Sequence, residues 1–395
     1  MNEKKKNSNL NSKMRTNKLI AIIFLLTISL ILVMNIIAKD KQYSESENRM
    51  LQQKPNLSLS GIESGRFMEQ YEKYKSDQFL GRNIWVKIKI SIDLLEGKRD
   101  SNNVFKGKSN YLLEDITQPD TKTLDQNLDA IKSFQNKYSD IPMYMMLVPN
   151  AANILSDKLP AFAVTANQNE FLKSIESSLN GYLNWIDVTP VLQEHKDENI
   201  YYHTDHHWTT LGAYYCFQQL AQDFNLDLST TPKLESYAVT DSFNGTLSST
   251  SGYETSYKEP IYIYSAKNKE DNTNVIVNYV DEQIKTTTLY DTSKLDSKDK
   301  YAVFLGGNHS RIDIKTTSES TKKLLLIKDS FANCMIPFLV SYYREIIVID
   351  PRYYYGDLDL IMEQNSISTV LFLYNCNTFL EDNSINGVLQ NTEIK

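Results

Sequence analysis

The pattern of hydrophobic and polar positions begins with one uninterrupted apolar run. It spans residues 19–38 and contains only three polar side chains, Thr27, Ser29 and Asn35. A run of this length matches a helix that crosses the roughly 30 Å hydrocarbon core of a bilayer. Basic residues dominate 1–18, and no small-residue cleavage site follows the run. We therefore expect a single-pass signal anchor at 19–38, a basic cytoplasmic tail at 1–18, and the remainder outside the cell membrane.

The pattern is weaker over residues 39–115. The part next to the apolar run is polar, which predicts a juxtamembrane stalk, and helical spacing follows at 62–74 and 85–95. Residues 104–113 predict a hairpin that turns at Gly107. We interpret 39–115 as a stalk with a helical and hairpin lead-in.

From residue 116 onward, predicted strands alternate with predicted helices. Short apolar runs predict buried strands at 143–148, 185–191, 323–327, 346–349 and 370–374. Helical spacing is found at 121–138, 171–183, 209–224, 331–343 and 358–363. This alternation is typical of an α/β domain with a three-layer arrangement, a parallel sheet covered by helices on both faces. Residues 240–320 instead alternate polar and apolar, so we expect a β-rich, solvent-facing insertion within a domain at 116–395.

Composition excludes some partners. The formal net charge is -7, and the basic tail makes the exported part more acidic still. Such a surface is unsuited to nucleic acid, which binds basic proteins. The three cysteines, Cys216, Cys334 and Cys376, show neither a disulfide framework nor a zinc-binding spacing. We expect no nucleic-acid partner, no cofactor, and buried free thiols or at most one cysteine pair.

The most distinctive segment is Tyr201–Thr209, which holds three of the five histidines. If it is extended, Asp205 and His207 share a face and His206 points away. A carboxylate beside an imidazole fixes its tautomer, as in the base half of a catalytic triad. In an alternative interpretation, His203, Asp205 and His207 are metal ligands with one open coordination position.

The candidate nucleophile is Ser330. It follows the predicted strand at 323–327 and begins a predicted helix, which places it at the carboxyl edge of the sheet. Main-chain N–H groups at a helix start are suited to stabilise an oxyanion. We therefore predict a triad of Ser330, His207 and Asp205, the alternative being that Ser330 only caps the helix.

Other residues are candidates for substrate or oxyanion binding. Gly307 and Asn308 follow an apolar run, and Asn150 follows a predicted strand. Such positions bring N–H groups to a ligand, although a simple turn accounts for them equally well. Aromatic residues of the same regions are candidates for stacking on a sugar, although aromatic residues more often belong to the core: Tyr201, Tyr202, Trp208 and Tyr253.

The string Asp205-His206-His207-Trp208 resembles the DHHW protein family, whose name it spells. Most of the exported chain shares the resemblance, through segments 46–51, 77–82, 107–112, 306–308 and 328–330. That family is similar to the AlgX- and AlgJ-type alginate O-acetyltransferases, which carry SGNH-hydrolase-like domains. The resemblance implies a permuted SGNH-like fold, because the Asp-x-His pair precedes the serine in the chain.

The resemblance implies an O-acyltransferase, specifically an O-acetyltransferase of a cell-surface or secreted polysaccharide. It makes Ser330 the nucleophile, His207 the base and Asp205 its orienting partner. Because acetyl-CoA is cytoplasmic, it also implies a membrane-bound, MBOAT-type acyltransferase as donor partner. Lys328 stands where SGNH hydrolases have glycine, so their oxyanion donors are not carried over. Two other functions remain open, a carbohydrate esterase with the same triad and a non-catalytic cell-envelope scaffold.

Overall fold

The computed structural model describes two compact units, Met1–Glu96 and Gly97–Lys395. The described residues are 2–44, 47, 49–230, 232–253, 255–268 and 271–390. Small parts of the predicted tail, lead-in, insertion and C-terminal end lie outside them, including Ser46 and Asn48 of the motif at 46–51. The domain boundary expected at 115/116 stays a prediction.

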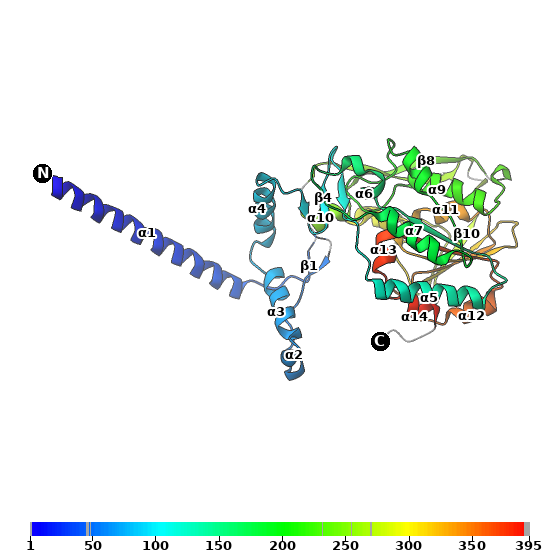
Figure 1. The fold of residues 1–395 in the computed structure, drawn as a ribbon, viewed down its shortest axis with the longest axis horizontal. Helices are drawn as coiled ribbons and strands as arrows, with labels where there is room; N and C mark the ends of the chain where they lie inside the picture. Colours follow the sequence, from blue (N-terminus) through cyan, green and yellow to red (C-terminus); the bar gives the residue numbers. More distant parts are fainter. Residues whose placement is uncertain are drawn as a thin grey trace. The chain divides into compact units, whose positions relative to one another are not determined.

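The first unit is mainly helical (Figure 1). Within helix α1 (Asn2–Ile37), Lys13–Ile37 is long and apolar enough to cross a membrane, a test that an N-terminal signal sequence also passes. Arg49 pairs with Asp77 at 2.6 Å between Nη2 and Oδ1 and so connects β2 to the end of α3. The other elements are β1 (Tyr43–Ser44), β2 (Arg49–Met50), α2 (Leu59–Glu63), α3 (Arg66–Asp77) and α4 (Arg82–Leu95).

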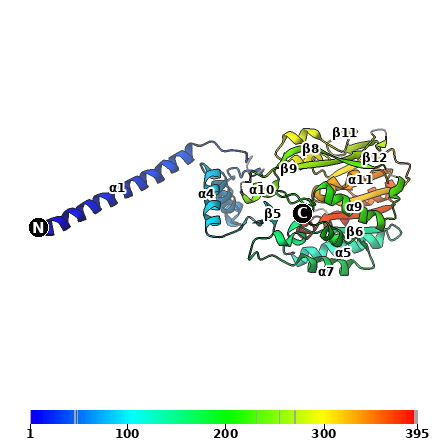
Figure 2. The same cartoon turned by 90° about the horizontal axis from the view of Figure 1, so that it is seen from above.

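The second unit is built around an eight-stranded mixed sheet with the order β11-β10-β12-β14-β13-β15-β6-β7 (Figures 1 and 2). The neighbours from β14 to β7 are parallel, as predicted. Their bounds are β6 (Met143–Val148), β7 (Asn184–Trp185), β13 (Lys323–Lys328), β14 (Glu345–Ile349) and β15 (Thr369–Asn375).

Helices cover both faces of this sheet. In β13, Leu324 and Leu326 belong to one buried cluster, while Leu325 and Ile327 belong to the other. Successive residues of a strand face opposite sides, so a strand covered on both faces is apolar throughout. The first cluster is covered by α6 (Ala151–Ile154), α8 (Thr189–Glu194), α9 (Thr210–Asp223) and α11 (Ile336–Leu339). The second is covered by α5 (Thr121–Lys137), α7 (Gln168–Leu179), α12 (Leu358–Asn365), α13 (Cys376–Glu381) and α14 (Ile385–Leu389). The three cysteines lie buried and unpaired in these clusters.

Two predicted elements of the second unit are wrong in type or are divided, and a proline lies in the first turn of the helix found at each. The strand expected at 185–191 ends at Trp185, and α8 begins at Thr189 with Pro190 in its first turn. The helix expected at 331–343 is divided into a 3-10 turn, η6 (Ser330–Cys334), and α11, again with a proline in the first turn. Proline lacks an N–H and restricts the residue before it, so it starts helices and interrupts longer ones.

The β-rich insertion differs from the expectation of a solvent-facing sheet. Only β8 (Leu234–Phe243) and β9 (Glu259–Ala266) form a separate antiparallel pair, and α10 (Thr246–Ser251) lies between them in sequence. The strands β10 (Val275–Tyr279), β11 (Ile284–Thr286) and β12 (Arg311–Thr316) extend the main sheet, because β12 pairs antiparallel with β14. The alternate apolar residues of β10 and β12 lie buried in the first cluster, whereas Ile284 of β11 is exposed. The sheet is therefore mixed, not wholly parallel.

A small antiparallel sheet precedes the first helix of the second unit. It consists of β3 (Asp100–Ser101), β4 (Val104–Lys106) and β5 (Leu112–Glu114), and its β4–β5 pair is the predicted hairpin. A Cβ on Gly107 would lie 2.6 Å from the carbonyl oxygen of Lys158. Glycine is therefore needed where this hairpin approaches the neighbouring backbone.

Candidate active site

Ser330 lies at the carboxyl end of β13, as the first residue of η6. The preceding Asp329 fixes this turn, since its Oδ1 accepts the Phe331 N–H at 2.9 Å and its Oδ2 accepts the Asn375 N–H at 3.0 Å. Asn375 ends the neighbouring parallel strand β15. Asp329 thus links the ends of β13 and β15 next to Ser330. Ser330 itself is half-buried at this edge of the sheet.

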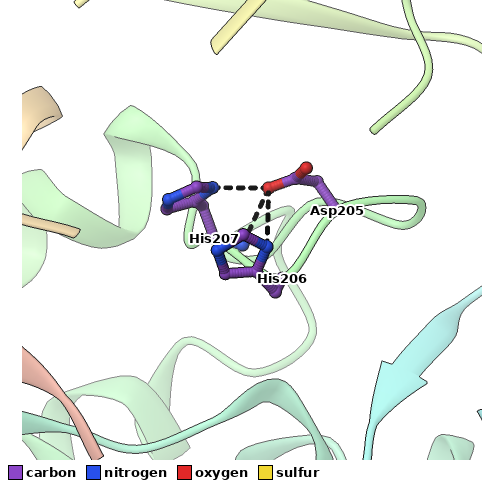
Figure 3. Close-up of side chains that lie close together, drawn as sticks. All are labelled: Asp205, His206 and His207. Carbon is purple, nitrogen blue, oxygen red and sulfur yellow. Dashed lines mark hydrogen bonds and ion pairs between the residues drawn. The ribbon is translucent and has the colours of Figure 1, made fainter. Parts of the chain in front are cut away.

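Three side chains form a continuous chain of hydrogen-bonding contacts. Nδ1 of His207 lies 2.5 Å from Oδ1 of Asp205 (Figure 3), and Nε2 of His207 lies 2.8 Å from Oγ of Ser330. A carboxylate only accepts, so the imidazole proton resides on Nδ1 and leaves Nε2 free to accept from the serine hydroxyl. This arrangement suits proton removal from Ser330.

The segment that carries Asp205 and His207 is a loop, so the premise of an extended segment was wrong. Tyr201 and Trp208 form an isolated antiparallel bridge that closes the loop. The main-chain N–H of His207 turns back to Oδ1 of Asp205 at 3.0 Å. His206 does not point away, because its Nδ1 lies 3.7 Å from Asp205 and its ring centroid lies 3.9 Å from that of His207 (Figure 3).

The second carboxylate oxygen of Asp205 is held by the start of α10. Oδ2 accepts the Thr246 N–H at 2.7 Å and the Thr246 hydroxyl at 2.9 Å. Burial raises the pKa of Asp205, but the imidazoles of His206 and His207 and these hydrogen bonds outweigh it, so the pKa lies well below its ordinary value. Asp205 is therefore an anion at neutral pH, able to stabilise an imidazolium on His207.

The insertion also fixes the rest of the loop. Glu259, the first residue of β9, accepts the main-chain N–H groups of His203 and Thr204 and the Thr204 hydroxyl, at 2.9 to 3.1 Å. Thr204 Oγ1 in turn accepts the Gly245 N–H at 2.9 Å. Sequence reasoning missed Glu259, Gly245 and Thr246, because they lie far from the loop in the chain and belong to a segment assigned to the solvent-facing surface.

Gly245→Ala should disturb Asp205 directly. A Cβ at this position would lie 2.2 Å from Cβ of Asp205 and 2.5 Å from its Oδ2. We expect a loss of stability of about 1–3 kcal/mol from overpacking and a loss of roughly 100-fold in kcat from displacement of the Asp205–His207 pair. Thermal unfolding and turnover of an activated acetyl ester measure the two effects. Thr250→Ala, at an exposed position of α10, is the control; an active Gly245→Ala protein would contradict the assignment.

The predicted aromatic sugar wall is buried. Tyr201, Tyr202, Trp208 and Tyr253 are at most 3% exposed, and the Trp208 indole N–H donates to the Phe331 carbonyl at 2.9 Å. This contact connects the histidine loop to the turn that carries the candidate nucleophile. Tyr202 nevertheless lines a cleft of about 540 Å³ near Glu259, together with three tyrosines that sequence reasoning did not single out: Tyr257, Tyr262 and Tyr264.

Two of the predicted oxyanion candidates are committed to other contacts. The Gly307 N–H donates to the Phe304 carbonyl at 3.2 Å, so Gly307 shapes a turn. Asn150 is buried, and its Oδ1 accepts Gln168 Nε2 at 2.7 Å while its Nδ2 donates to Glu114 Oε2 at 2.9 Å. Asn150 therefore organises a buried polar network at the ends of β6 and β15.

Asn308 differs from these two because it is exposed. Its Oδ1 accepts Lys328 Nζ at 3.3 Å and Asn333 Nδ2 at 3.2 Å. Within the described residues, neither Nδ2 of Asn308 nor the main-chain N–H of Ser330 has an acceptor. Both are candidate oxyanion donors near the turn of Ser330.

The alternative metal set is not brought together. His203 stacks on Tyr111 with ring centroids 3.8 Å apart, and its Nδ1 lies 3.2 Å from Glu259. Potential ligand atoms of Asp205, His206 and His207 do lie within 4.8 Å of one another. Both ring nitrogens of His207 are already engaged, by Asp205 and by Ser330.

Comparison with known proteins identifies relatives of the chain as a whole. The family model described as DHHW protein matches residues 125–349. No curated protein matches the sequence. A DHHW family protein from Eubacterium siraeum superposes with a TM-score of 0.62 at 22% identity, over 75% of this chain and 97% of that one.

Two further solved structures are similar. PatB1 of Bacillus cereus, solved with a sulfonyl adduct, has a TM-score of 0.57 at 21% identity, over 72% of this chain and 98% of that one. The O-acetyltransferase domain of Pseudomonas putida AlgJ has a TM-score of 0.45 at 11% identity, over 73% of this chain and 99% of that one. At these identities the first two similarities show a shared mixed α/β fold, and the third is too distant to support an argument.

Proposed function

The chain belongs to the DHHW protein family, and we propose that it is an extracytoplasmic O-acyltransferase, specifically an O-acetyltransferase, that modifies a cell-surface or secreted polysaccharide. One observation carries this proposal, the chain of contacts from Asp205 through His207 to Ser330. A serine hydroxyl in contact with an oriented imidazole is the usual basis of acyl transfer through a covalent intermediate.

In the first half-reaction, Oγ of Ser330 attacks the carbonyl carbon of an acyl donor while its proton passes to Nε2 of His207. The carbonyl oxygen becomes an oxyanion, which Nδ2 of Asn308 and the Ser330 N–H stabilise. When this intermediate collapses, the bond to the leaving group breaks and the leaving group takes the proton from His207. An acyl-serine remains.

In the second half-reaction, a sugar hydroxyl attacks the acyl-serine and gives its proton to His207. The bond to Oγ of Ser330 breaks, and the proton returns to that oxygen. The product is an O-acylated sugar, and water in place of the sugar would give hydrolysis.

The location of the enzyme is part of the same proposal. The apolar part of α1 and the basic residues before it support a signal anchor with the second unit outside the membrane. Because acyl-CoA is cytoplasmic, a membrane-bound acyltransferase of the MBOAT type would then supply the acyl group. The order of Asp205 and His207 before Ser330 supports a permuted SGNH-hydrolase-like domain, entered through the lead-in at 39–115.

The proposal is tested with the full-length protein in detergent. It is incubated with p-nitrophenyl acetate, with and without oligosaccharide acceptors, and products are identified by mass spectrometry. We expect leaving-group release, an acetyl group on Ser330, and acetylated sugar when an acceptor is present. A sulfonyl fluoride, chosen because PatB1 was solved with a sulfonyl adduct, should modify Ser330. Hydrolysis alone with every acceptor would favour the esterase, and folded protein without turnover or label would favour the scaffold.

A further inference from the structure

Lys328, the last residue of β13, is completely buried two positions before Ser330. Lysine is seldom fully buried unless its charge is paired. Its Nζ has two partners, Oδ2 of Asp350 at 3.3 Å and Oδ1 of Asn308 at 3.3 Å. The question is which of the two explains the position.

Asp350 has a second counter-ion besides Lys328. Arg352 contacts it with both ends of the guanidinium, at 2.8 Å from Nε to Oδ1 and 2.7 Å from Nη2 to Oδ2. Although burial raises the pKa of Asp350, the two cations outweigh it and hold the pKa below its ordinary value. A bidentate arginine pair neutralises a carboxylate by itself, so the lysine is left with a second task at Asn308.

The contacts of Asn308 determine how its amide is turned. Lys328 Nζ and Asn333 Nδ2 can only donate to it, so the atom they share must be the carbonyl oxygen of Asn308. The NH2 group then faces away from both. Asn333 belongs to the same turn as Ser330, and its Nδ2 also donates to the Gly307 carbonyl at 3.3 Å. Without these two donors, an exposed side-chain amide would turn easily about its χ2 bond.

We infer that Lys328 is a positioning residue, which acts through Asn308. By donating to the Asn308 carbonyl, it directs the Asn308 NH2 group toward the oxyanion that forms on the acyl group of Ser330. If the amide turned over, a lone pair of Oδ1 would face that oxyanion instead, and stabilisation would become repulsion. This inference rests on the proposed function, because it concerns the acyl intermediate.

The test compares three substitutions in the full-length protein in detergent, with p-nitrophenyl acetate as substrate. Lys328→Met removes the ammonium group that donates to Asn308, while Asp350 keeps Arg352 as its counter-ion. We expect kcat to fall about 10- to 100-fold, with KM changed less than about two-fold. Lys328→Gln, which retains an N–H donor, should stay within about five-fold of the native enzyme. Lys323→Met, at the other end of β13 and partly exposed, is the matched control and should be neutral.

A double-substitution cycle separates positioning from a general structural effect. Asn308→Ala should lower kcat by about 100-fold or more. Adding Lys328→Met to the Asn308→Ala variant should then lower kcat by less than about three-fold further, because no amide is left to orient. Equal activity of Lys328→Met and native enzyme, or fully multiplicative losses, would overturn the inference.

Two results keep this test separate from the proposed function. If native protein shows no turnover and no label on Ser330, the proposed function fails and the inference fails with it; if native protein is active but Lys328→Met is too, only the inference fails. If circular dichroism shows that Lys328→Met does not fold, Lys328→Gln and Asn308→Asp test the inference in its place. An active Lys328→Gln with an Asn308→Asp loss of about 100-fold supports positioning, and the opposite pattern overturns it.

Discussion

Ser330→Ala should lower turnover of an activated acetyl ester by about 10⁴-fold or more. The hydroxyl that it removes lies 2.8 Å from Nε2 of His207, and its oxygen is the protein atom that bonds to the acyl group in the proposed mechanism. Without it, His207 retains its carboxylate partner but has no nucleophile to activate. The acetyl-enzyme and the sulfonyl adduct should both be absent from the mass spectrum.

Stability should change little, because Ser330 is half-buried and its turn is held by Asp329 and not by its own side chain. The matched control is Ser341→Ala, which removes another partly buried serine hydroxyl, hydrogen-bonded to Thr273 at 2.8 Å. Ser341→Ala should keep native turnover. If folded Ser330→Ala protein remained active, the nucleophile would lie elsewhere and the proposed function would lose its basis.

Asp205→Asn should lower kcat by roughly 10⁴-fold, through the tautomer of His207. Thr246 offers two donors to Oδ2 of Asp205, so an asparagine would place its carbonyl oxygen there and its NH2 group toward Nδ1 of His207. The imidazole must then accept at Nδ1 and carry its proton on Nε2. A protonated Nε2 cannot take the proton of Ser330, so the nucleophile is not activated.

This effect is measured as kcat at saturating ester, with circular dichroism to verify folding. Asp382→Asn is a matched control, since Asp382 is also buried, and it caps the turn at Ser384 away from the proposed triad. It should leave kcat unchanged. Native kcat in Asp205→Asn protein would show that the carboxylate does not set the tautomer, even if Ser330 proved to be the nucleophile.

Local patterns were sufficient for most elements of the second unit. The apolar runs that became β6, β13, β14 and β15 are continuous because both faces of the sheet are covered, and a run of that kind is visible in the sequence. Residues of α8 were predicted as strand, and η6 and α11 were predicted as one helix, because in each case the apolar pattern continued where a proline changed the backbone. The strands β10 and β12 were assigned to a separate solvent-facing sheet, because their alternation shows that one face is buried but not which sheet that face belongs to.

For the site, the sequence by itself determined which residue types could take part. Asp205 and His207 are close in the chain, and Ser330 follows an apolar strand, so their chemistry could be inferred from neighbours alone. Whether the two segments meet is a matter of long-range packing, and contacts such as that of Trp208 with Phe331 bring them together.

Only the tertiary structure decided what surrounds these residues. Thr246 holds the carboxylate of Asp205, and Lys328 orients the amide of Asn308. The tertiary structure also showed that Asn150 and Trp208 are buried and already hydrogen-bonded. The physical reason is that a side chain's chemical type is local, whereas its burial and hydrogen-bond partners are set by segments far apart in the sequence.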